Sequence, residues 1–311
     1  MSELPGQKVV TTHSPYFLQH VPFREIRLVR IGENGTTVHS IPRVFRAALP
    51  HLATIDPIID ASEGLLSHDR GLGQLRVHGT LPRDTFRELL VAYNGREDTA
   101  TLHQELRSVY DSSKLFVTDA ELEQLETFAK RIRGEILFAR RWLLVEGQSE
   151  FHLVHGIAAA MDYNLDEQGV SVIDFQNNGN PECFAVLARA LGIPWLIVVD
   201  HDDAGQNYLT KLRNRDFSEE EMNERSFQLP DGYLEQQLVA DGLQEELKEL
   251  LQQLEVDGVN DMNDNELIET LKEDKSGYAA ILGRRCSQDR ALATRMPEPF
   301  RQAIQALRGL A

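Results

Sequence analysis

The sequence has few cysteines and no long apolar run. Its two cysteines, Cys183 and Cys286, lie far apart and form no CxxC pair, so neither a disulfide framework nor a cysteine-based zinc module is indicated. No segment reaches the roughly 18 apolar residues that a membrane span requires. Residues 1–10 lack the basic and apolar blocks of a secretory signal. We therefore expect a cytoplasmic protein with no membrane partner.

Basic residues are also in the minority. The chain of 311 residues has 32 Lys and Arg against 49 Asp and Glu, a net charge of −17 that argues at first against a nucleic-acid partner. Much of the acid, however, lies in residues 242–275, which read as solvated helix, and basic clusters occur at 130–141, 211–215 and 283–290. Carboxylates that bind metal ions can also meet a polyanion through those ions. The net charge therefore does not exclude DNA.

The first part of the chain carries mixed signals. Residues 9–12 read as a buried strand, and residues 24–41 alternate apolar and polar residues around Asn34-Gly35, which predicts a hairpin. From about Val44 to Gly134 the pattern is mostly helical, with a looser stretch at 67–84. A helix is expected to begin at Thr118 or Asp119.

Strands and helices then alternate. We expect strands at 142–145, 169–175 and 193–200, and helices at 149–161, 181–192 and 203–214, with Ser149 capping the first helix and Gly192 closing the second. This alternation predicts an α/β fold with a doubly wound parallel sheet and right-handed crossovers. In such sheets the ligand site lies outside the carboxyl ends of the strands.

The first strand of this sheet ends on acids. Glu146 follows it directly, Gly147 allows close backbone approach, and Glu150 lies in the first turn of the next helix. The competing interpretation of Glu150 is a first-turn acid that faces the helix dipole.

The third strand delivers acids to the same edge. It runs into Asp200, Asp202 and Asp203, and Gly205 permits a tight turn into the following helix. Because side chains two residues apart share a face in extended chain, Asp200 and Asp202 can converge on one ion. The competing interpretation is a solvated turn.

The two acid sets together predict a metal site. Carboxylates gathered at one edge would repel one another and raise each other's pKa unless cations compensate. Mg²⁺ and Mn²⁺ prefer such oxygen ligands. A structural role is expected instead for His152 and His155, because their HxxH spacing has neither an HExxH context nor matching cysteines.

At these residues the chain resembles known proteins. "LLVEGQSE" followed by "IVVDHDDAG" resembles the Toprim fold of topoisomerases, primases and several nucleases, and "RGEILFARRWLLVEGQSE" resembles more narrowly the overcoming-lysogenisation-defect (OLD) family of ATP-dependent nucleases. Members of that family carry an ABC-type ATPase followed by a Toprim domain. The resemblance implies a Toprim-type sheet with flanking helical segments and a metal-dependent endonuclease that acts on DNA.

The resemblance extends to the start of the chain. "VVTTHSP" is similar to the end of an ABC ATPase, where a strand presents the switch histidine, and His13 matches that residue. No GxxxxGK[ST] motif occurs in the chain. The chain thus resembles the carboxyl-terminal part of a longer protein that uses ATP only through its missing ATPase part, and that part implies a homodimer.

Two later segments resemble further parts of the nuclease site. In "FQLPDGYLEQQL" Glu235 matches an acid that the family supplies, while Tyr233 stands where the family has an aspartate. In "KEDKSGYAAIL" Lys275 matches the basic catalytic residue; the competing interpretation is a solvated lysine that opens a helix.

These matches imply two Mg²⁺ or Mn²⁺ ions. We expect Glu146, Asp200 and Asp202 to hold one ion, Glu150 with Glu235 or Asp203 to hold the other, and Lys275 to act on the scissile phosphate. The expected divisions are 1–45 (ATPase fragment), 46–136 (mostly helical connection), 137–230 (Toprim domain) and 231–311 (helices that complete the site).

Three alternatives remain open. A different Toprim enzyme is one, although a type IA topoisomerase requires a larger body and a bacterial primase usually brings a zinc module. A receiver-like phosphoacceptor domain would carry its acidic pair after the first strand. The intact acids Glu146, Glu150, Asp200 and Asp202 argue against a degenerate Toprim module that only binds DNA or dimerises, whereas the altered Tyr233 segment keeps this alternative open.

Overall fold

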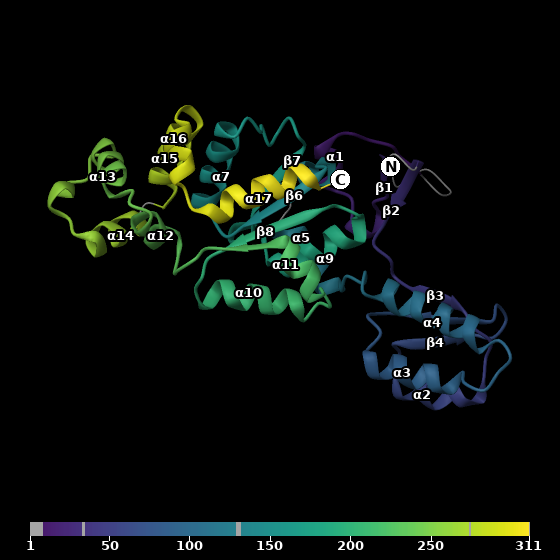
Figure 1. Cartoon of the computed structure of the whole chain (residues 1–311). Coiled ribbons are helices and arrows are strands. Elements are labelled where there is room, and N and C mark those ends of the chain that lie inside the picture. The colour runs from purple at the N-terminus through teal and green to yellow at the C-terminus, as the bar shows by residue number, and fades with distance from the viewer. Residues whose placement is uncertain (1–8, 33–34, 129–131, 274, 311) are drawn as a thin grey trace.

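A parallel β-sheet forms the centre of the computed structural model, which describes residues 9–32, 35–128, 132–273 and 275–310. Each pair of neighbouring strands is parallel. In spatial order the strands are β7 (Val170–Asp174), β6 (Arg141–Val145), β8 (Trp195–Val199) and β9 (Ser226–Gln228) (Figure 1). The predicted α/β fold with a parallel sheet is therefore confirmed.

Both faces of the sheet are covered, as the continuous apolar runs of its strands require. Side chains alternate along β6: Leu143 and Val145 enter one core, whereas Trp142 and Leu144 enter the other. The first core is covered by α7 (Gln148–Ala160), α12 (Leu234–Ala240), α15 (Lys275–Gln288) and α17 (Glu298–Gly309). The second is covered by α5 (Asp119–Phe128), α6 (Arg133–Phe138), α9 (Pro181–Leu191) and α10 (Asp203–Arg213).

The strand–helix order of this region follows the sequence prediction closely. Helix α9 ends at Gly192, which has a left-handed conformation with φ of 62°, so the predicted stop signal is confirmed. The start of α7 differs, because its N-cap is Gly147 and the expected cap Ser149 lies buried inside the first turn. Strand β9 has only three residues and gives too short a pattern to recognise.

The amino-terminal part contains one confirmed element and one correction. The hairpin pairs β1 (Leu28–Gly32) with β2 (Gly35–His39) in antiparallel register, and its connecting residues lie outside the described part. The predicted strand at 9–12 is wrong: these residues form no strand, and Val9 is 85% exposed. A strand needs a hydrogen-bonded neighbour, and no described strand lies beside them. They are followed by α1 (Pro15–Leu18) and η1 (Phe23–Glu25).

Residues 45–113 form a smaller unit with its own core (Figure 1). A three-stranded antiparallel sheet in the order β3-β5-β4 packs against helices. The elements are β3 (Phe45–Ala48), η2 (Ala53–Ile55), α2 (Asp56–Ala61), β4 (Leu66–Asp69), β5 (Gln74–Val77), α3 (Arg83–Ala92) and α4 (Thr99–Ser113). Strands β4 and β5 lie where the sequence predicts only a looser stretch, because four residues carry too little periodicity to stand out.

The start of α5 agrees with its capping signal. The backbone N–H of Thr118 donates to Glu121 Oε2 at 2.8 Å, and the Glu121 N–H donates to Thr118 Oγ1 at 3.2 Å. After β7 and β8 the remaining elements are α8 (Phe175–Asn178), α11 (Glu219–Arg225), α13 (Gln244–Gln253), η3 (Val259–Asp261), α14 (Asp264–Glu273) and α16 (Arg290–Arg295). None of the described helices is both long and apolar enough to cross a bilayer.

Helices α7 and α15 approach each other through two glycines. A Cβ atom on Gly156 would overlap the carbonyl group of Gly283, and a Cβ on Gly283 would overlap the carbonyl group of His152. The obstacle is backbone in both cases, so no rotation of a side chain can relieve the overlap. The two glycines thereby let α15, which comes late in the chain, lie directly against the first crossover helix of the sheet.

This contact predicts that Gly283→Ala destabilises the protein. Forcing a methyl group between two packed backbones costs about 2 to 3 kcal/mol, so the thermal unfolding midpoint should fall by roughly 5 °C. Differential scanning calorimetry checks it, with Gly309→Ala as the control, because a Cβ at Gly309 meets no described atom within 4 Å. Equal midpoints for the two variants would contradict the packing argument.

Candidate functional site

The carboxyl ends of β6 and β8 meet at Glu146. The backbone N–H of Asp200 donates to Glu146 Oε1 at 2.7 Å, and Gln176 Nε2 donates to Glu146 Oε2 at 3.2 Å. The Gln176 N–H also donates to the Glu146 carbonyl at 3.0 Å. Glu146 is therefore buried and tied to the residues that follow both neighbouring strands.

Glu150 is held at the start of α7. The backbone N–H of Gly147 donates to Glu150 Oε2 at 2.9 Å, which satisfies a donor at the helix start. Gly147 has extended backbone, and a Cβ there would lie 3.3 Å from Glu150 Oε2. The predicted role of Gly147 in close approach is thus visible as a tight contact with the Glu150 carboxylate.

The acids after β8 occupy different places. Asp202 caps α10, because its Oδ1 accepts the Gly205 N–H at 2.8 Å. Asp203 is the first residue of α10 and is exposed. A Cβ on Gly205 would overlap the Asp200 carbonyl oxygen, so the glycine lets the first turn of α10 pack against the backbone of Asp200. The expected pairing of Asp200 and Asp202 side chains thus meets a competing use of Asp202 as a helix cap.

Glu235 approaches the site from the carboxyl-terminal helices. It lies in the first turn of α12, is 1% exposed, and accepts a hydrogen bond from the Tyr278 hydroxyl at 3.0 Å. The His201 N–H donates to the Gly232 carbonyl at 2.7 Å, which ties the loop before α12 to the loop after β8. Burial first, then the negative charges of Glu235 and Glu150, raises the pKa of Tyr278 well above its usual range.

A cavity of about 340 Å³ opens at this edge of the sheet. Glu146, Glu150 and Asp200 line it, whereas Asp202, Asp203 and Glu235 are not among its lining residues. Lys275 begins α15, but its side chain lies outside the described part of the structure. The full lining is Glu146, Gly147, Gln148, Ser149, Glu150, Gln176, Asn177, Asp200, Lys272 and Glu273.

The electrostatics of the cavity centre on Asp200. Burial raises the pKa of this carboxyl to about 9, with further contributions from Glu150, Glu146, Glu235 and Asp202 in that order. Without a cation, Asp200 therefore carries a proton at neutral pH. The neighbouring acids are close enough to act on one another, and their oxygen atoms are the ligands that Mg²⁺ and Mn²⁺ prefer.

The described side chains are not arranged as a finished metal cage. Among the residues that the structure describes, no group of three or more His, Cys, Asp or Glu could hold a metal ion as it stands. Glu146, Glu150 and Asp202 each direct an oxygen to a backbone N–H. A carboxylate has a second oxygen and further lone pairs, so these hydrogen bonds fix the acids while leaving capacity for a cation. The donor set fits a hard divalent ion.

Several cavity residues were not recognised in the sequence. Gln176 and Asn177 come from α8, which follows β7, so the rule that identified the acids after the other two strands also applies to them. Lys272 and Glu273 end α14, and Tyr278 lies three residues after Lys275. No local pattern marks Lys272, Glu273 or Tyr278, because only the tertiary packing of α14 and α15 brings them here.

Neither His155 nor His13 is among the residues that line the cavity. His155 Nδ1 contacts the Phe151 carbonyl of its own helix at 2.7 Å, which fits the structural role expected for it. His13 is exposed, and its ring centroid lies 6.0 Å from that of Phe138. The role of His13 as an ATPase switch stays a prediction.

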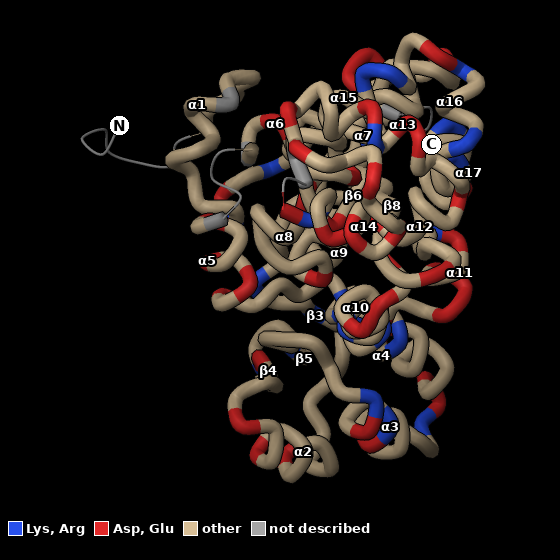
Figure 2. Tube along the Cα trace, turned by 90° about the vertical axis from the view of Figure 1, so that its left-hand side faces the viewer, with Lys and Arg blue, Asp and Glu red and all other residues tan. Residues whose placement is uncertain are grey.

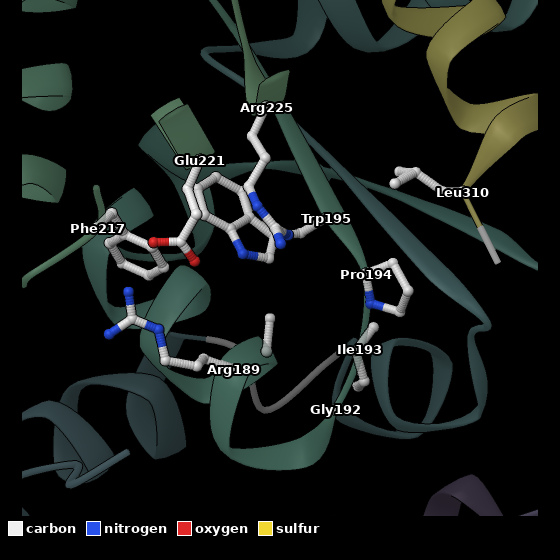
Figure 3. A pocket seen from close by; sticks show the side chains of 10 residues that line it. Arg189, Gly192, Ile193, Pro194, Trp195, Phe217, Glu221, Arg225 and Leu310 are labelled. Carbon is white, nitrogen blue, oxygen red and sulfur yellow. The ribbon is translucent and has the colours of Figure 1, made fainter. Parts of the chain in front are cut away.

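A second cavity, of about 380 Å³, lies at the opposite end of β8, beside Trp195 (Figure 3). The two arginine side chains that line it make contacts within the protein. The Arg189 guanidinium lies 3.5 Å from the centroid of the Phe217 ring and donates to the Asp216 carbonyl at 3.3 Å. Arg225 lies over the Trp195 ring at 5.5 Å. The metal-type donors thus gather at the carboxyl end of the sheet.

Comparison with known proteins identifies the central segment. Residues 137–202 match the family model "Overcoming lysogenization defect protein-like, TOPRIM domain". The uncharacterized protein YbjD of Escherichia coli (strain K12) is 38% identical over 82 residues, which are 26% of this chain and 15% of that protein. The match therefore spans a small part of the curated relative. The predicted resemblance to the OLD-family Toprim domain is confirmed for the matched segment.

Solved structures of similar proteins include two OLD carboxyl-terminal regions. The region from Burkholderia pseudomallei is 23% identical, with 55% of this chain and 98% of that chain covered and a TM-score of 0.44. The region from Xanthomonas campestris pv. campestris, phased with platinum, is 23% identical, with 56% of this chain and 95% of that chain covered and a TM-score of 0.44.

The raised pKa of Asp200 predicts a pH-dependent stability. In the unfolded chain this carboxyl ionises near its ordinary value of 3.8, but in the fold it stays protonated to about 9, so rising pH between these values favours unfolding. Asp200→Asn removes this dependence of stability on pH, because the amide does not ionise. In EDTA we expect this variant to be more stable than the unsubstituted protein at pH 8, by on the order of 2 kcal/mol, with a smaller difference at pH 5.

Thermal unfolding at both pH values measures the effect, with the exposed Asp166→Asn as the control. A variant no more stable than the parent protein at pH 8 would show that Asp200 is already ionised without metal.

The Tyr278–Glu235 hydrogen bond gives a second prediction. Tyr278→Phe leaves a buried carboxylate oxygen without this donor, so the free energy of unfolding should fall by about 1 to 3 kcal/mol. Tyr163→Phe is the matched control, because the Tyr163 hydroxyl is buried and has no hydrogen-bond partner in the described structure. Urea unfolding of both variants makes the comparison, and equal losses would contradict a specific role of the Tyr278 hydroxyl.

Proposed function

We propose that this chain, whose residues 137–202 match the OLD-like Toprim family model, is a metal-dependent endonuclease that nicks or cleaves DNA. One observation carries the proposal: Glu146, Glu150 and Asp200 line a single cavity at the carboxyl edge of the sheet. The pKa of Asp200, raised to about 9, supports the proposal. Buried carboxylates that repel one another are stabilised when a cation binds between them.

The proposed reaction is phosphodiester hydrolysis. Two divalent cations, if bound by these acids, would supply activation of the attacking water and neutralisation of charge on the leaving oxygen. Asp202 can cap α10 with one oxygen and face a cation with the other. The proposed ligand sets are Glu146, Asp200 and Asp202 for one Mg²⁺ or Mn²⁺ ion, and Glu150 with Glu235 or Asp203 for the other.

Lys275 is the proposed basic residue at the scissile phosphate. It is the first residue of α15, and Tyr278, one turn later on that helix, contacts Glu235. Residues three apart on a helix lie on neighbouring positions of one face, which supports a location of Lys275 near the acids. In that location its ammonium group would neutralise charge that builds up on the phosphate, an effect worth roughly 3 kcal/mol where a comparable donor is removed.

The longer-range proposals concern the rest of the protein. We propose that residues 1–45 belong to an ABC-type ATPase, with His13 as its switch residue and ATP and dimerisation dependent on the part outside this chain. Residues 46–136 would connect it to the Toprim domain at 137–230, and residues 231–311 would complete the nuclease site. The separate core around β3, β4 and β5 marks off residues 45–113, whereas Leu18, Phe23, Ile26 and Ile41 share a core with β6 and β8. The proposed location is the cytoplasm.

A second candidate function is a non-catalytic Toprim module that binds DNA or dimerises. The use of Asp202 as a helix cap and the presence of Tyr233 where the family has an acid favour it. Another Toprim strand-cleaving enzyme is also compatible with the cavity acids. The three functions differ in whether metal-dependent cleavage occurs and whether water is the acceptor.

The proposed nuclease predicts metal-dependent nicking of supercoiled plasmid. Cleavage should appear with Mg²⁺ or Mn²⁺, vanish in EDTA, and fall by about 100-fold or more in Asp200→Ala and Glu146→Ala, because each removes a ligand of the reacting centre. Asp166→Ala, an exposed acid away from the cavity, should cleave normally. Calorimetric titration with Mn²⁺ should show binding that the two cavity variants lose.

Two negative results have different meanings. Absence of cleavage with Mn²⁺ binding intact would favour the non-catalytic module or a need for the ATPase part. Absence of both cleavage and Mn²⁺ binding would show that the two-cation site is wrong.

A further inference from the structure

Lys272 has an unusual position on the acid-lined cavity. It lies at the end of α14, whose other charged residues are all acidic: Asp264, Glu266, Glu269 and Glu273 (Figure 2). Among the described residues that line the cavity, Lys272 is the one basic side chain. Lys272 is therefore the one place on α14 where an approaching polyanion would meet a positive charge.

An aromatic ring fixes the ammonium group. Lys272 Nζ lies 3.9 Å from the centroid of the Tyr233 ring and 2.8 Å from Glu269 Oε1. The Glu269 side chain is 69% exposed, so water screens that ion pair, and an exposed pair of this kind contributes little. The ring face attracts the cation without neutralising it. Lys272 thus keeps a positive charge at a defined place.

The Tyr233 ring also places Lys272 near the acids, because Tyr233 is close in sequence to Glu235. Tyr233 precedes α12, and Glu235 lies two residues later in the first turn of that helix. The loop before α12 is itself paired with the loop after β8 through His201 and Gly232. The distance between the ammonium group and the acid cluster is therefore set by short, hydrogen-bonded connections and not by a flexible loop.

We propose that Lys272, positioned by the Tyr233 ring, binds a backbone phosphate of the DNA strand next to the phosphate that is cleaved. This inference rests on the proposed nuclease function and adds a substrate contact to it. A strand that enters a cavity lined by carboxylates needs a fixed cation for the phosphates that no metal ion serves. Lys272, which lines the cavity, supplies that cation. The neutral Tyr233 ring stands where the family has an aspartate, so it adds no negative charge beside the ammonium group.

The test measures how DNA binding depends on salt. Removal of one lysine–phosphate ion pair lowers the slope of log K against log salt by about 0.7 to 0.9. With a short fluorescein-labelled duplex in Ca²⁺, and strand integrity checked on a gel, Lys272→Ala should lower the slope by that amount and weaken binding roughly fivefold at moderate salt. In plasmid cleavage with Mg²⁺ the KM should rise by a similar factor while kcat stays close to that of the parent protein.

Matched variants separate the ammonium group from the ring. Lys272→Arg keeps the charge and should restore the slope, whereas Tyr233→Phe keeps the ring face but removes the hydroxyl that also interacts with the Lys272 ammonium group, so it should weaken binding less than Tyr233→Leu does. Tyr233→Leu removes the ring and should weaken binding, with a smaller change of slope than Lys272→Ala. Lys248→Ala, on α13 with its Nζ on the Asn260 carbonyl, is the control lysine. Circular dichroism of every variant establishes that it is folded.

The outcomes distinguish the two proposals. If the parent protein cleaves DNA, Asp200→Ala abolishes cleavage, and Lys272→Ala keeps the parent slope and KM, then the nuclease stands and the role of Lys272 is overturned. If the parent protein neither cleaves nor binds DNA in any metal, both proposals are overturned. A slope lowered equally by Lys248→Ala would also overturn the inference, because the effect would then come from net charge.

Discussion

The contact between Gly156 and Gly283 is the constraint on which the candidate site depends. Because neither residue has a Cβ, the backbone of α15 can lie directly on α7. Tyr278, near the start of α15, then lies close enough to Glu150 in the first turn of α7 for that carboxylate to raise the pKa of its hydroxyl, and the hydroxyl donates to Glu235 on α12. One backbone contact thus joins an acid of the sheet edge to an acid of the carboxyl-terminal helices. A larger residue at either glycine would separate the two sets.

Burial disfavours the ionised form of each acid of the site, and the hydrogen bonds that compensate for it differ from one acid to the next. Glu146 and Glu150 accept backbone N–H groups at 2.7 and 2.9 Å, and such bonds stabilise the ionised form. Asp200 donates its own N–H to Glu146, while burial and four neighbouring carboxylates raise the pKa of its side chain to about 9. The raised pKa of Asp200 thus reports both its burial and the repulsion from these carboxylates. A proton on Asp200 relieves that repulsion in the metal-free protein, and a divalent cation would relieve it in the proposed metal-bound state.

The sequence predicts the sheet edge well because the relevant signals are local. Continuous apolar runs such as Trp142–Val145 fix the buried strands, and the acid and glycine after each run can be read directly. Prediction from local sequence fails where contacts with distant parts of the chain decide the secondary structure. Residues 9–12 have a strand-like composition but no partner strand, and β4 and β5 are too short to show a period. Tyr278 and Lys272 gain their importance only through packing that no local pattern encodes.

The residues that a local sequence pattern reveals and the residues that only tertiary packing reveals also differ in their chemistry. The family match covers residues 137–202, which contain Glu146, Glu150 and Asp200 and thus the part of the site that faces the proposed cations. Lys272, which lines the cavity, and Glu235, which accepts the Tyr278 hydroxyl, both lie beyond the match. In the proposed nuclease, the matched segment would supply the cation ligands, and Lys272 on α14 would add a contact with the DNA strand.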